Sequence, residues 1–260
     1  GDGDDGMVGP NGDDDIGAEA NTMGDDLDVL NLGTGLEVKQ ITAGREHACA
    51  LFTNNKVKCW GNNDYGKLGQ NDETDRCTSN SNCGDNLPYI ELGTTVKQIN
   101  AGGEFTCALM SNNKVKCWGY NNKGQLGYGD TEARGEFGSG AYSSCTHSSK
   151  PYEMGNCLPY VDLGSGKTAK QISAGGNHAC AILNDDTVKC WGYTLQGRLG
   201  NEQGKLIPSE GFDNIPSIGD ASGEMGNNLP IVNLGSGKKA KKIVANDGFT
   251  CAVLTDNTLK

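Results

Sequence analysis

The sequence has no long hydrophobic run and no stretch with sustained helical periodicity. Only 35% of its 260 residues are hydrophobic and 6% are aromatic. No segment is apolar enough to cross a membrane as a helix, so membrane insertion is not expected. Glycine, in contrast, accounts for 40 residues, which suits many short strands joined by tight turns. We therefore expect an all-β protein with little helix.

One stretch recurs along the chain. It runs over residues 41–69 as ITAGREHACALFTNNKVKCWGNNDYGKLG, returns over 99–127 and 172–200, and begins again at residue 243. The first cysteines of successive copies are 58, 73 and 71 residues apart. A recurring unit too short to bury its own apolar face predicts a propeller, a solenoid or an array. The length varies only between the copies, so insertions fall in loops.

The repeated stretch is predicted to form a β-hairpin. Cys49 and Cys59 point to one face if residues 53–55 form a three-residue loop whose last residue, Asn55, is left-handed. The same place is held by Asn113, Asp186 and Asn257 in the other copies. Asn and Asp tolerate the left-handed conformation better than other residues with a side chain, so all four copies predict the same turn.

The hairpin register places Cys49 directly opposite Cys59, within reach of a disulfide. The same spacing recurs in Cys107 with Cys117 and in Cys180 with Cys190. Alternatively, these are small buried residues left reduced, which is common for free cysteine. We favour disulfides because the cysteines come in pairs at one fixed spacing.

The order of motifs resembles that of a known family. In each full copy, AG is followed by HACAL, FTCAL or HACAI, a tight turn, VKCWG, and a closing GKLG, GQLG or GRLG. This pattern is similar to the repeat of the regulator of chromosome condensation family and covers almost the whole chain. The resemblance implies a β-propeller with seven blades of four antiparallel strands, of which about four blades are present here. The cysteine pair in the hairpin is like that of bacterial and algal versions and departs from the nuclear ones.

Four short strands can be assigned to each blade, which in the first blade are LDVLNLG, EVKQITAG, HACALF and KVKCWG. Residues 1–260 are then one partial propeller. Its blades are expected at about 27–61, 87–119, 158–192 and 229–260. The insertion loops take up 1–26, 70–86, 128–157 and 201–228.

Two insertion loops contain a cysteine pair of their own, Cys77 with Cys83 and Cys145 with Cys157. A disulfide inside a long polar loop would lower the entropy of the open loop. Zinc binding is the competing interpretation, but the only nearby histidine is His147 and the spacing is not CxxC. We favour disulfides, which leaves Cys251 unpaired.

The first 26 residues are acidic and contain no basic residue. Calcium takes carboxylate and carbonyl oxygens, but the spacing follows neither the EF-hand nor the glycine-rich nonapeptide repeat. We expect a solvated acidic loop and no cofactor, with calcium binding as the alternative. The acidic residues are Asp2, Asp4, Asp5, Asp13, Asp14, Asp15, Glu19, Asp25 and Asp26.

Other repeat positions are predicted to be structural. His47 and His178 stand where the other copies have Phe105 and Phe249, and a position that accepts Phe is packing rather than a catalytic base. GSGK, at 164–167 and 235–238, lacks the full phosphate-loop spacing and is expected to be a hairpin turn. The tryptophans are expected to pack between blades, and the glycines to serve turns with positive φ. They are Trp60, Trp118, Trp191, Gly66, Gly124 and Gly197.

No nucleophile, base and orienting group can be assembled, so we expect no enzyme. The net charge of −11 repels phosphate backbones, which argues against nucleic acid as a partner. The main hypothesis is a non-catalytic propeller in an oxidising compartment, extracellular or in an organelle lumen. It would present its loops to a protein partner or form a subunit of a larger assembly. The resemblance implies two alternatives: a nucleotide-exchange-like regulator of a small GTPase in the cytosol or nucleus, and a secreted inhibitor of an enzyme.

The chain is also expected to be part of a longer protein. By the hairpin spacing, the partner of Cys251 would stand one position after Lys260. Four blades do not fill the seven-bladed ring that the resemblance implies. We therefore expect an open arc with an unpaired blade edge at each end.

Overall fold

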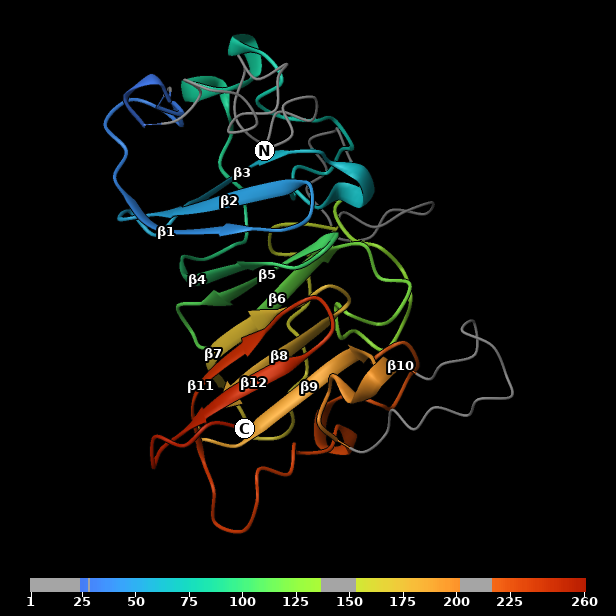
Figure 1. Ribbon diagram of the computed structural model, residues 1–260. Helices are drawn as coiled ribbons and strands as arrows, with labels where there is room; N and C mark the ends of the chain where they lie inside the picture. Colours follow the sequence, from blue (N-terminus) through green and yellow to red (C-terminus); the bar gives the residue numbers. More distant parts are fainter. Residues whose placement is uncertain (1–23, 28, 137–152, 202–216) are drawn as a thin grey trace.

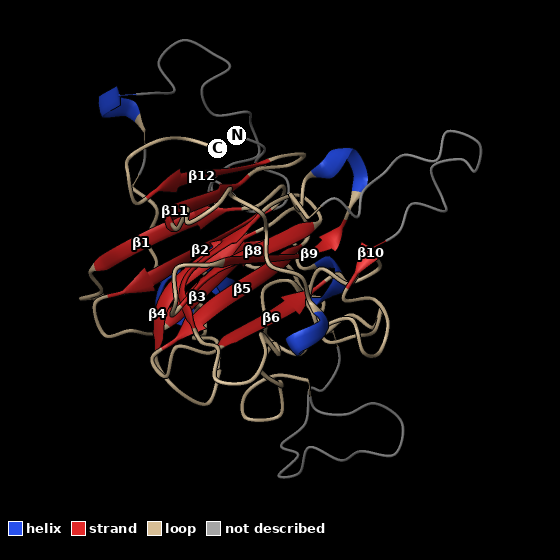
Figure 2. Cartoon of the chain, turned by 90° about the horizontal axis from the view of Figure 1, so that it is seen from below, coloured by secondary structure: helices blue, strands red, loops and turns tan. Residues whose placement is uncertain are grey.

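The computed structural model describes residues 24–27, 29–136, 153–201 and 217–260, and within them the fold is almost all β-structure (Figure 1). The strands are β1 (Val38–Ala43), β2 (His47–Phe52), β3 (Val57–Gly61), β4 (Val96–Ala101), β5 (Phe105–Met110), β6 (Val115–Gly119), β7 (Ala169–Ala174), β8 (His178–Leu183), β9 (Val188–Tyr193), β10 (Ser217–Ile218), β11 (Ala240–Ala245) and β12 (Thr250–Leu254). The described helices are single 3₁₀ turns in the loops (Figure 2). They are η1 (Gly24–Asp26), η2 (Asp64–Gly66), η3 (Asn80–Asn82), η4 (Gly84–Asn86), η5 (Leu195–Gly197) and η7 (Gly226–Asn228). None of these turns has the length and apolar character that crossing a bilayer requires.

The strands form four antiparallel sheets, one for each copy of the repeat, in the order β1-β2-β3, β4-β5-β6, β10-β9-β8-β7 and β11-β12. The predicted hairpin register is confirmed, since Cys49 lies opposite Cys59 and Leu51 opposite Val57. The predicted turn is confirmed as well: Asn55 has a φ of 60°. The equivalent Asn113, Asp186 and Asn257 have φ values of 64°, 65° and 65°.

The segment at the outer edge of each of the first three sheets, beside the last strand of the hairpin, is not the one that the sequence predicts. The sequence pattern places residues 87–92 (LPYIEL) at the start of the second blade, but the Ile90 amide donates to the Val57 carbonyl oxygen of β3, at 2.9 Å. The segment thus lies beside the first sheet. Val161 on Val115 and Val232 on Val188 repeat this bond at 2.9 and 2.8 Å. Each of the first three sheets is completed by a segment that follows it in the chain.

The number of strands per sheet also differs from the expected four. Among the described strands, only the third sheet has four, because its insertion adds β10, which pairs with β9. In the first two sheets a single bridge takes that place, Gly61 with Arg76 and Gly119 with Arg134. The insertion loop interrupts the expected fourth strand. In the first sheet, for example, Arg76 bonds to one end of β3 and Ile90 to the other, so two short segments replace one continuous strand.

Successive sheets pack face to face. The apolar layer between the first two sheets contains Cys49 and Leu51 from β2 and Val96 and Ile99 from β4, all buried. Trp118 also lies in this layer, and its indole nitrogen donates to the Lys67 carbonyl oxygen at 3.0 Å. The predicted role of the tryptophans between blades is thereby confirmed for Trp118, and likewise for Trp191, which donates to the Gln125 carbonyl oxygen at 3.0 Å.

A glutamine side chain links each inner strand to the next. The Gln98 amide donates to the Ile172 carbonyl oxygen of β7 at 2.8 Å and accepts from the Ile172 amide at 3.1 Å. Gln40 bonds to Ile99 and Gln171 to Ile243 in the same way. Because β7 is the edge of its sheet, Ile172 has no strand beside it on that side, and Gln98 satisfies both of its backbone groups.

The turns around the sheets follow the sequence. Gly66, Gly124 and Gly197 have φ values of 66°, 66° and 73°, as expected. The two GSGK segments are turns, closed by bonds from the Lys167 amide to Gly164 and from the Lys238 amide to Gly235. They are not hairpin turns, because the segment before each of them belongs to the preceding sheet.

Candidate interaction surfaces and cysteine pairs

Three cysteine pairs lie across the hairpins at disulfide distance. The sulfur atoms of Cys49 and Cys59 are 1.95 Å apart, and both residues are fully buried. Cys107 with Cys117 and Cys180 with Cys190 have sulfur distances of 2.05 and 2.07 Å. All of these sulfurs face the layer between two sheets, so solvent reaches them only when the sheets separate.

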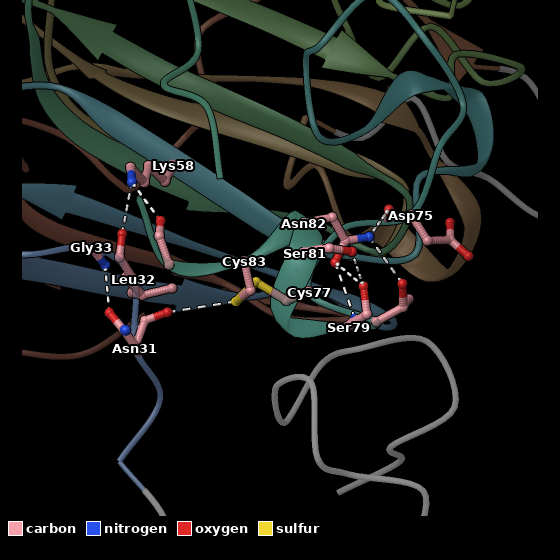
Figure 3. Close-up of a disulfide and its surroundings, with 12 residues drawn as sticks. Asn31, Leu32, Gly33, Lys58, Asp75, Cys77, Ser79, Ser81, Asn82 and Cys83 are labelled. Carbon is pink, nitrogen blue, oxygen red and sulfur yellow. Dashed lines mark hydrogen bonds between the residues drawn. A yellow bond between two sulfur atoms is a disulfide. The ribbon is translucent and has the colours of Figure 1, made fainter. Parts of the chain in front are cut away.

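The pair Cys77 and Cys83, with sulfurs 2.02 Å apart, closes a short loop over the first sheet (Figure 3). Both residues pack with Trp60 and Leu87, and the Cys83 sulfur lies 3.5 Å from the Asn31 carbonyl oxygen. Cys145 lies outside the described residues, so its pairing with Cys157 stays a prediction. Cys251 is half-buried on β12 and has no cysteine partner in the described part of the chain.

A buried lysine in each VKCWG segment is a feature that sequence reasoning missed. Lys58 is 3% exposed, and its ammonium group donates to the carbonyl oxygens of Leu32 and Gly84, at 2.7 and 3.0 Å (Figure 3). Burial lowers the pKa of Lys58, while the nearby Asp85 carboxylate raises it. Lys116 and Lys189 make the same pair of bonds. Each lysine joins the segment that precedes its hairpin to the segment that follows it.

The histidines are buried between sheets, as the sequence predicted. The His47 Nε2 atom lies 2.9 Å from the Thr106 hydroxyl oxygen, and that hydroxyl donates to the Lys67 carbonyl oxygen, also at 2.9 Å. Thr106 must then accept from His47, which places the His47 proton on Nε2 and leaves Nδ1 without a partner in the described residues. Burial, followed by the Lys67 charge, lowers the pKa of His47 to about 3.

The place held by histidine and threonine between the first two sheets is held by phenylalanine and alanine between the next two. His178 bonds to Thr250 at 2.8 Å, as His47 does to Thr106. The second sheet instead has Phe105, and the third sheet has Ala179 where the neighbouring sheets have threonine. Both Phe105 and Ala179 lie in the same apolar cluster. A histidine in one sheet thus goes with a threonine in the next, and a phenylalanine goes with an alanine.

A cavity of about 390 Å³ opens where the ends of the inner strands converge. Its wall consists of the loops that follow β1, β4, β7 and β11, and it includes Arg45 and Asp247. Close approach of these loops requires glycine: a Cβ on Gly44 would lie 2.3 Å from the Gly102 carbonyl oxygen. We call the end of the molecule that carries this opening the cavity face; it comprises residues 44–46, 62–67, 102–104, 120–125, 175–177, 193–198 and 246–248.

A row of stacked side chains runs across the cavity face from sheet to sheet. The rings of Tyr65 and Tyr120 are 4.3 Å apart between centroids, and Tyr65 is 39% exposed. Between the second and third sheets, the Lys123 ammonium lies 5.1 Å from the centroid of the Tyr193 ring, and Arg198 lies over the same ring at 4.9 Å. We call these five residues the tyrosine row. Aromatic and cationic groups held on a rigid scaffold are typical of protein-binding surfaces.

Metal binding finds no support in the described ranges, which contain no group of three histidine, cysteine or acidic residues placed to hold an ion. Of the acidic residues considered for calcium, only Asp25 and Asp26 fall in those ranges; the others lie outside the described residues.

The repeats match those of a known family. The regulator of chromosome condensation (RCC1) repeat matches residues 38–67, 96–125 and 169–198, and a second form of the same repeat matches 55–109. This chain carries RCC1 repeats. The sheets and hairpins described above are therefore those of RCC1 β-propeller repeats, and the family resemblance drawn from the sequence is confirmed.

Several known proteins are similar to this chain. The ultraviolet-B receptor UVR8 of Arabidopsis thaliana is 29% identical over 178 residues, which cover 67% of this chain and 34% of the receptor. The human X-linked retinitis pigmentosa GTPase regulator is 28% identical over 172 residues, 65% of this chain and 14% of that protein. The chain thus spans about a third or less of the length of these relatives.

Among solved structures, yeast RCC1 (Prp20) bound to Kap60 aligns with a TM-score of 0.60 and 19% identity, covering 88% of this chain and 44% of that one. Human WBSCR16 aligns with a TM-score of 0.52 and 17% identity, covering 84% and 44%. At these identities the likeness shows the fold.

Proposed function

We propose that this protein is a non-catalytic interaction module whose cavity face binds a protein partner in an extracellular or lumenal assembly. The tyrosine row carries the proposal. Its rings and cations come from three successive sheets, so they form one continuous surface only when the repeats are stacked. Loops on a rigid β-scaffold are where folds of this kind place recognition.

The relatives support an interaction role. One is by name a GTPase regulator, and the yeast RCC1 structure is a complex with Kap60. The GTPase regulator favours one alternative for this chain, control of a small GTPase in the cytosol or nucleus. The cysteine pairs favour the oxidising compartment, because reducing compartments keep thiols free.

Counting thiols separates the two compartments. Protein isolated from its natural source with an alkylating agent present throughout should, after denaturation, show no alkylation at the four pairs at disulfide distance. Peptide mapping identifies each alkylated residue. Alkylation at Cys49 and Cys59 in that preparation would rule out the oxidised, extracellular form.

Site-specific cross-linking tests the binding face. A photoreactive amino acid at Tyr65 should capture a defined partner in the source extract, and one at Gln196 should capture the same partner, since both stand at the same place in the repeat. The matched control carries the photoreactive group at Glu91, an exposed residue of the outer segment that completes the first sheet. Equal capture of that partner at Glu91 would show that the cavity face is not the binding surface.

A further inference from the structure

The two ends of the sheets differ in charge. The end opposite the cavity consists of the hairpin turns 53–56, 111–114, 184–187 and 255–258, and of the residues that lead into the inner strands, 37–39, 95–97, 167–170 and 238–242. We call this end the lysine face. It holds ten lysines and four acidic residues, a net charge of +6, in a chain of net charge −11. The cavity face holds four residues of each sign.

The lysine face is one continuous surface. Each hairpin turn bonds to its own inner strand, as when the Thr53 amide donates to the Glu37 carbonyl oxygen at 2.9 Å. Each of the first three turns also bonds to the next inner strand, as when the Val96 amide donates to the Asn55 carbonyl oxygen at 3.0 Å. The first bond recurs in all four copies and the second between each pair of successive copies, so the lysines of successive repeats stand in equivalent places on one rigid framework.

Five of the ten lysines on this face are held in position without being neutralised. The ammonium groups of Lys39, Lys97 and Lys241 contact the amide oxygens of the asparagines in the hairpin turns, at 3.3, 2.5 and 3.1 Å. A neutral amide orients an ammonium group but leaves its charge and two of its three donors free. Lys56 and Lys114 lie over the rings of Tyr89 and Tyr160, at 4.9 and 4.8 Å, again without a carboxylate. Only Lys167, Lys170 and Lys238 pair with acidic side chains.

We propose that the lysine face binds an acidic segment of a protein partner, laid across the hairpin turns of successive repeats. Oriented, unneutralised ammonium groups bind carboxylates with little loss of side-chain freedom. The face contains no arginine, so it lacks the fork that recognises phosphate in two-point contacts. A long polyanion such as DNA, or a membrane surface, would extend beyond the face and meet the net negative charge of the rest of the chain. A short acidic peptide stays within the positive region.

This inference rests on the proposed interaction function for the nature of the partner, but it concerns the other end of the molecule. Cross-linking at Tyr65 and peptide binding at the lysine face can therefore succeed or fail separately.

The test uses a fluorescent twelve-residue glutamate-rich peptide and fluorescence anisotropy at low and at physiological salt. The variant K97Q/K241Q should bind the peptide about tenfold more weakly than the natural sequence at low salt. The control R45Q/K123Q removes two positive charges from the cavity face and should change the affinity less than about twofold. Both variants alter the net charge equally, so the comparison separates local contacts from overall charge.

Two single substitutions in the turns sharpen the test. Asn113→Asp places a carboxylate on Lys97 and should weaken peptide binding, whereas Asp186→Asn removes the carboxylate from Lys170 and should strengthen it. Both residues have the same left-handed conformation, with φ values of 64° and 65°, so either side chain fits either turn.

The proposal is overturned if R45Q/K123Q weakens peptide binding as much as K97Q/K241Q does, or if the two turn substitutions have no effect. It is also overturned if a short DNA duplex or vesicles containing phosphatidylserine bind more tightly than the peptide and depend on the same lysines. Circular dichroism of each variant shows whether the sheets are intact.

Discussion

Replacing both His47 by Phe and Thr106 by Ala should exchange one natural contact between sheets for another. The pair His47 and Thr106 joins the first two sheets, and the pair Phe105 and Ala179 stands at the same positions between the second and third. The surroundings match, because a Cβ on Gly44 would lie 2.4 Å from the His47 ring, and one on Gly102 would lie 2.2 Å from the Phe105 ring. The double variant H47F/T106A therefore places known partners in an equivalent site.

Each single substitution should destabilise the protein. H47F removes one buried hydrogen bond, about 1 kcal/mol, and presses a larger ring against the Thr106 hydroxyl, which adds roughly 1 kcal/mol or more. T106A leaves the His47 Nε2–H group buried without an acceptor, at a cost of about 1–3 kcal/mol, and also removes the bond to the Lys67 carbonyl oxygen. We expect a loss of about 2 kcal/mol in the free energy of unfolding for each single variant.

The double variant should lose less than either single variant, about 1 kcal/mol, because the apolar pair leaves no polar group unsatisfied. The coupling between the two positions is then about 3 kcal/mol. Urea unfolding without reductant, followed by tryptophan fluorescence, measures all four proteins, and an unchanged slope with urea shows that the comparison is valid. A double variant that loses the sum of the two single losses would refute the pairing rule.

Three further predictions follow from buried polar groups. Burial lowers the pKa of His47 to about 3 and of His178 to about 4, so below pH 6.5 the unfolded chain binds protons first. The free energy of unfolding should thus fall by up to about 1.4 kcal/mol per pH unit for each histidine between pH 6.5 and 4, and H47F/T106A should show a smaller slope; an identical slope would contradict this assignment. Gln98→Ala should cost about 1–3 kcal/mol and speed amide hydrogen exchange at Ile172, and retained protection at Ile172 would show that the Gln98 bonds do not matter. Lys116→Met leaves two buried carbonyl oxygens without a donor and should cost about 2–3 kcal/mol in the same urea assay, whereas an unchanged midpoint would mean that water replaces the ammonium group.

The hairpins could be predicted from the sequence because their register depends on local chemistry. Asn55 and its counterparts determine the turn, and the turn determines that Cys49 faces Cys59. The sheet to which residues 87–92 belong could not be predicted in this way. An alternating apolar segment pairs equally well with the strand before it or after it, and the choice depends on tertiary contacts such as the bond from Lys58 on β3 to the Gly84 carbonyl oxygen, just before this segment.

The buried lysines were missed because Lys58 stands at a polar place in an alternating strand, which ordinarily indicates exposure to solvent. The contacts between sheets left a clearer signal. HA and FT alternate along the four copies, so histidine and the next threonine vary together. The glutamine that stands in VKQI in the first two copies and in AKQI in the third is a second signal of this kind.

A repeat of the sequence does not coincide with one sheet of the structure. Residues 87–92 complete the first sheet, although they lead directly into β4 of the second. A gene duplication one repeat long therefore adds one inner strand, one hairpin and one outer segment. This holds for a duplication that begins in any of the loops. The new copy gives its outer segment to the sheet before it and receives one from the copy after it. Recombination within such a gene can change the number of repeats without a defined boundary, and every internal sheet remains complete.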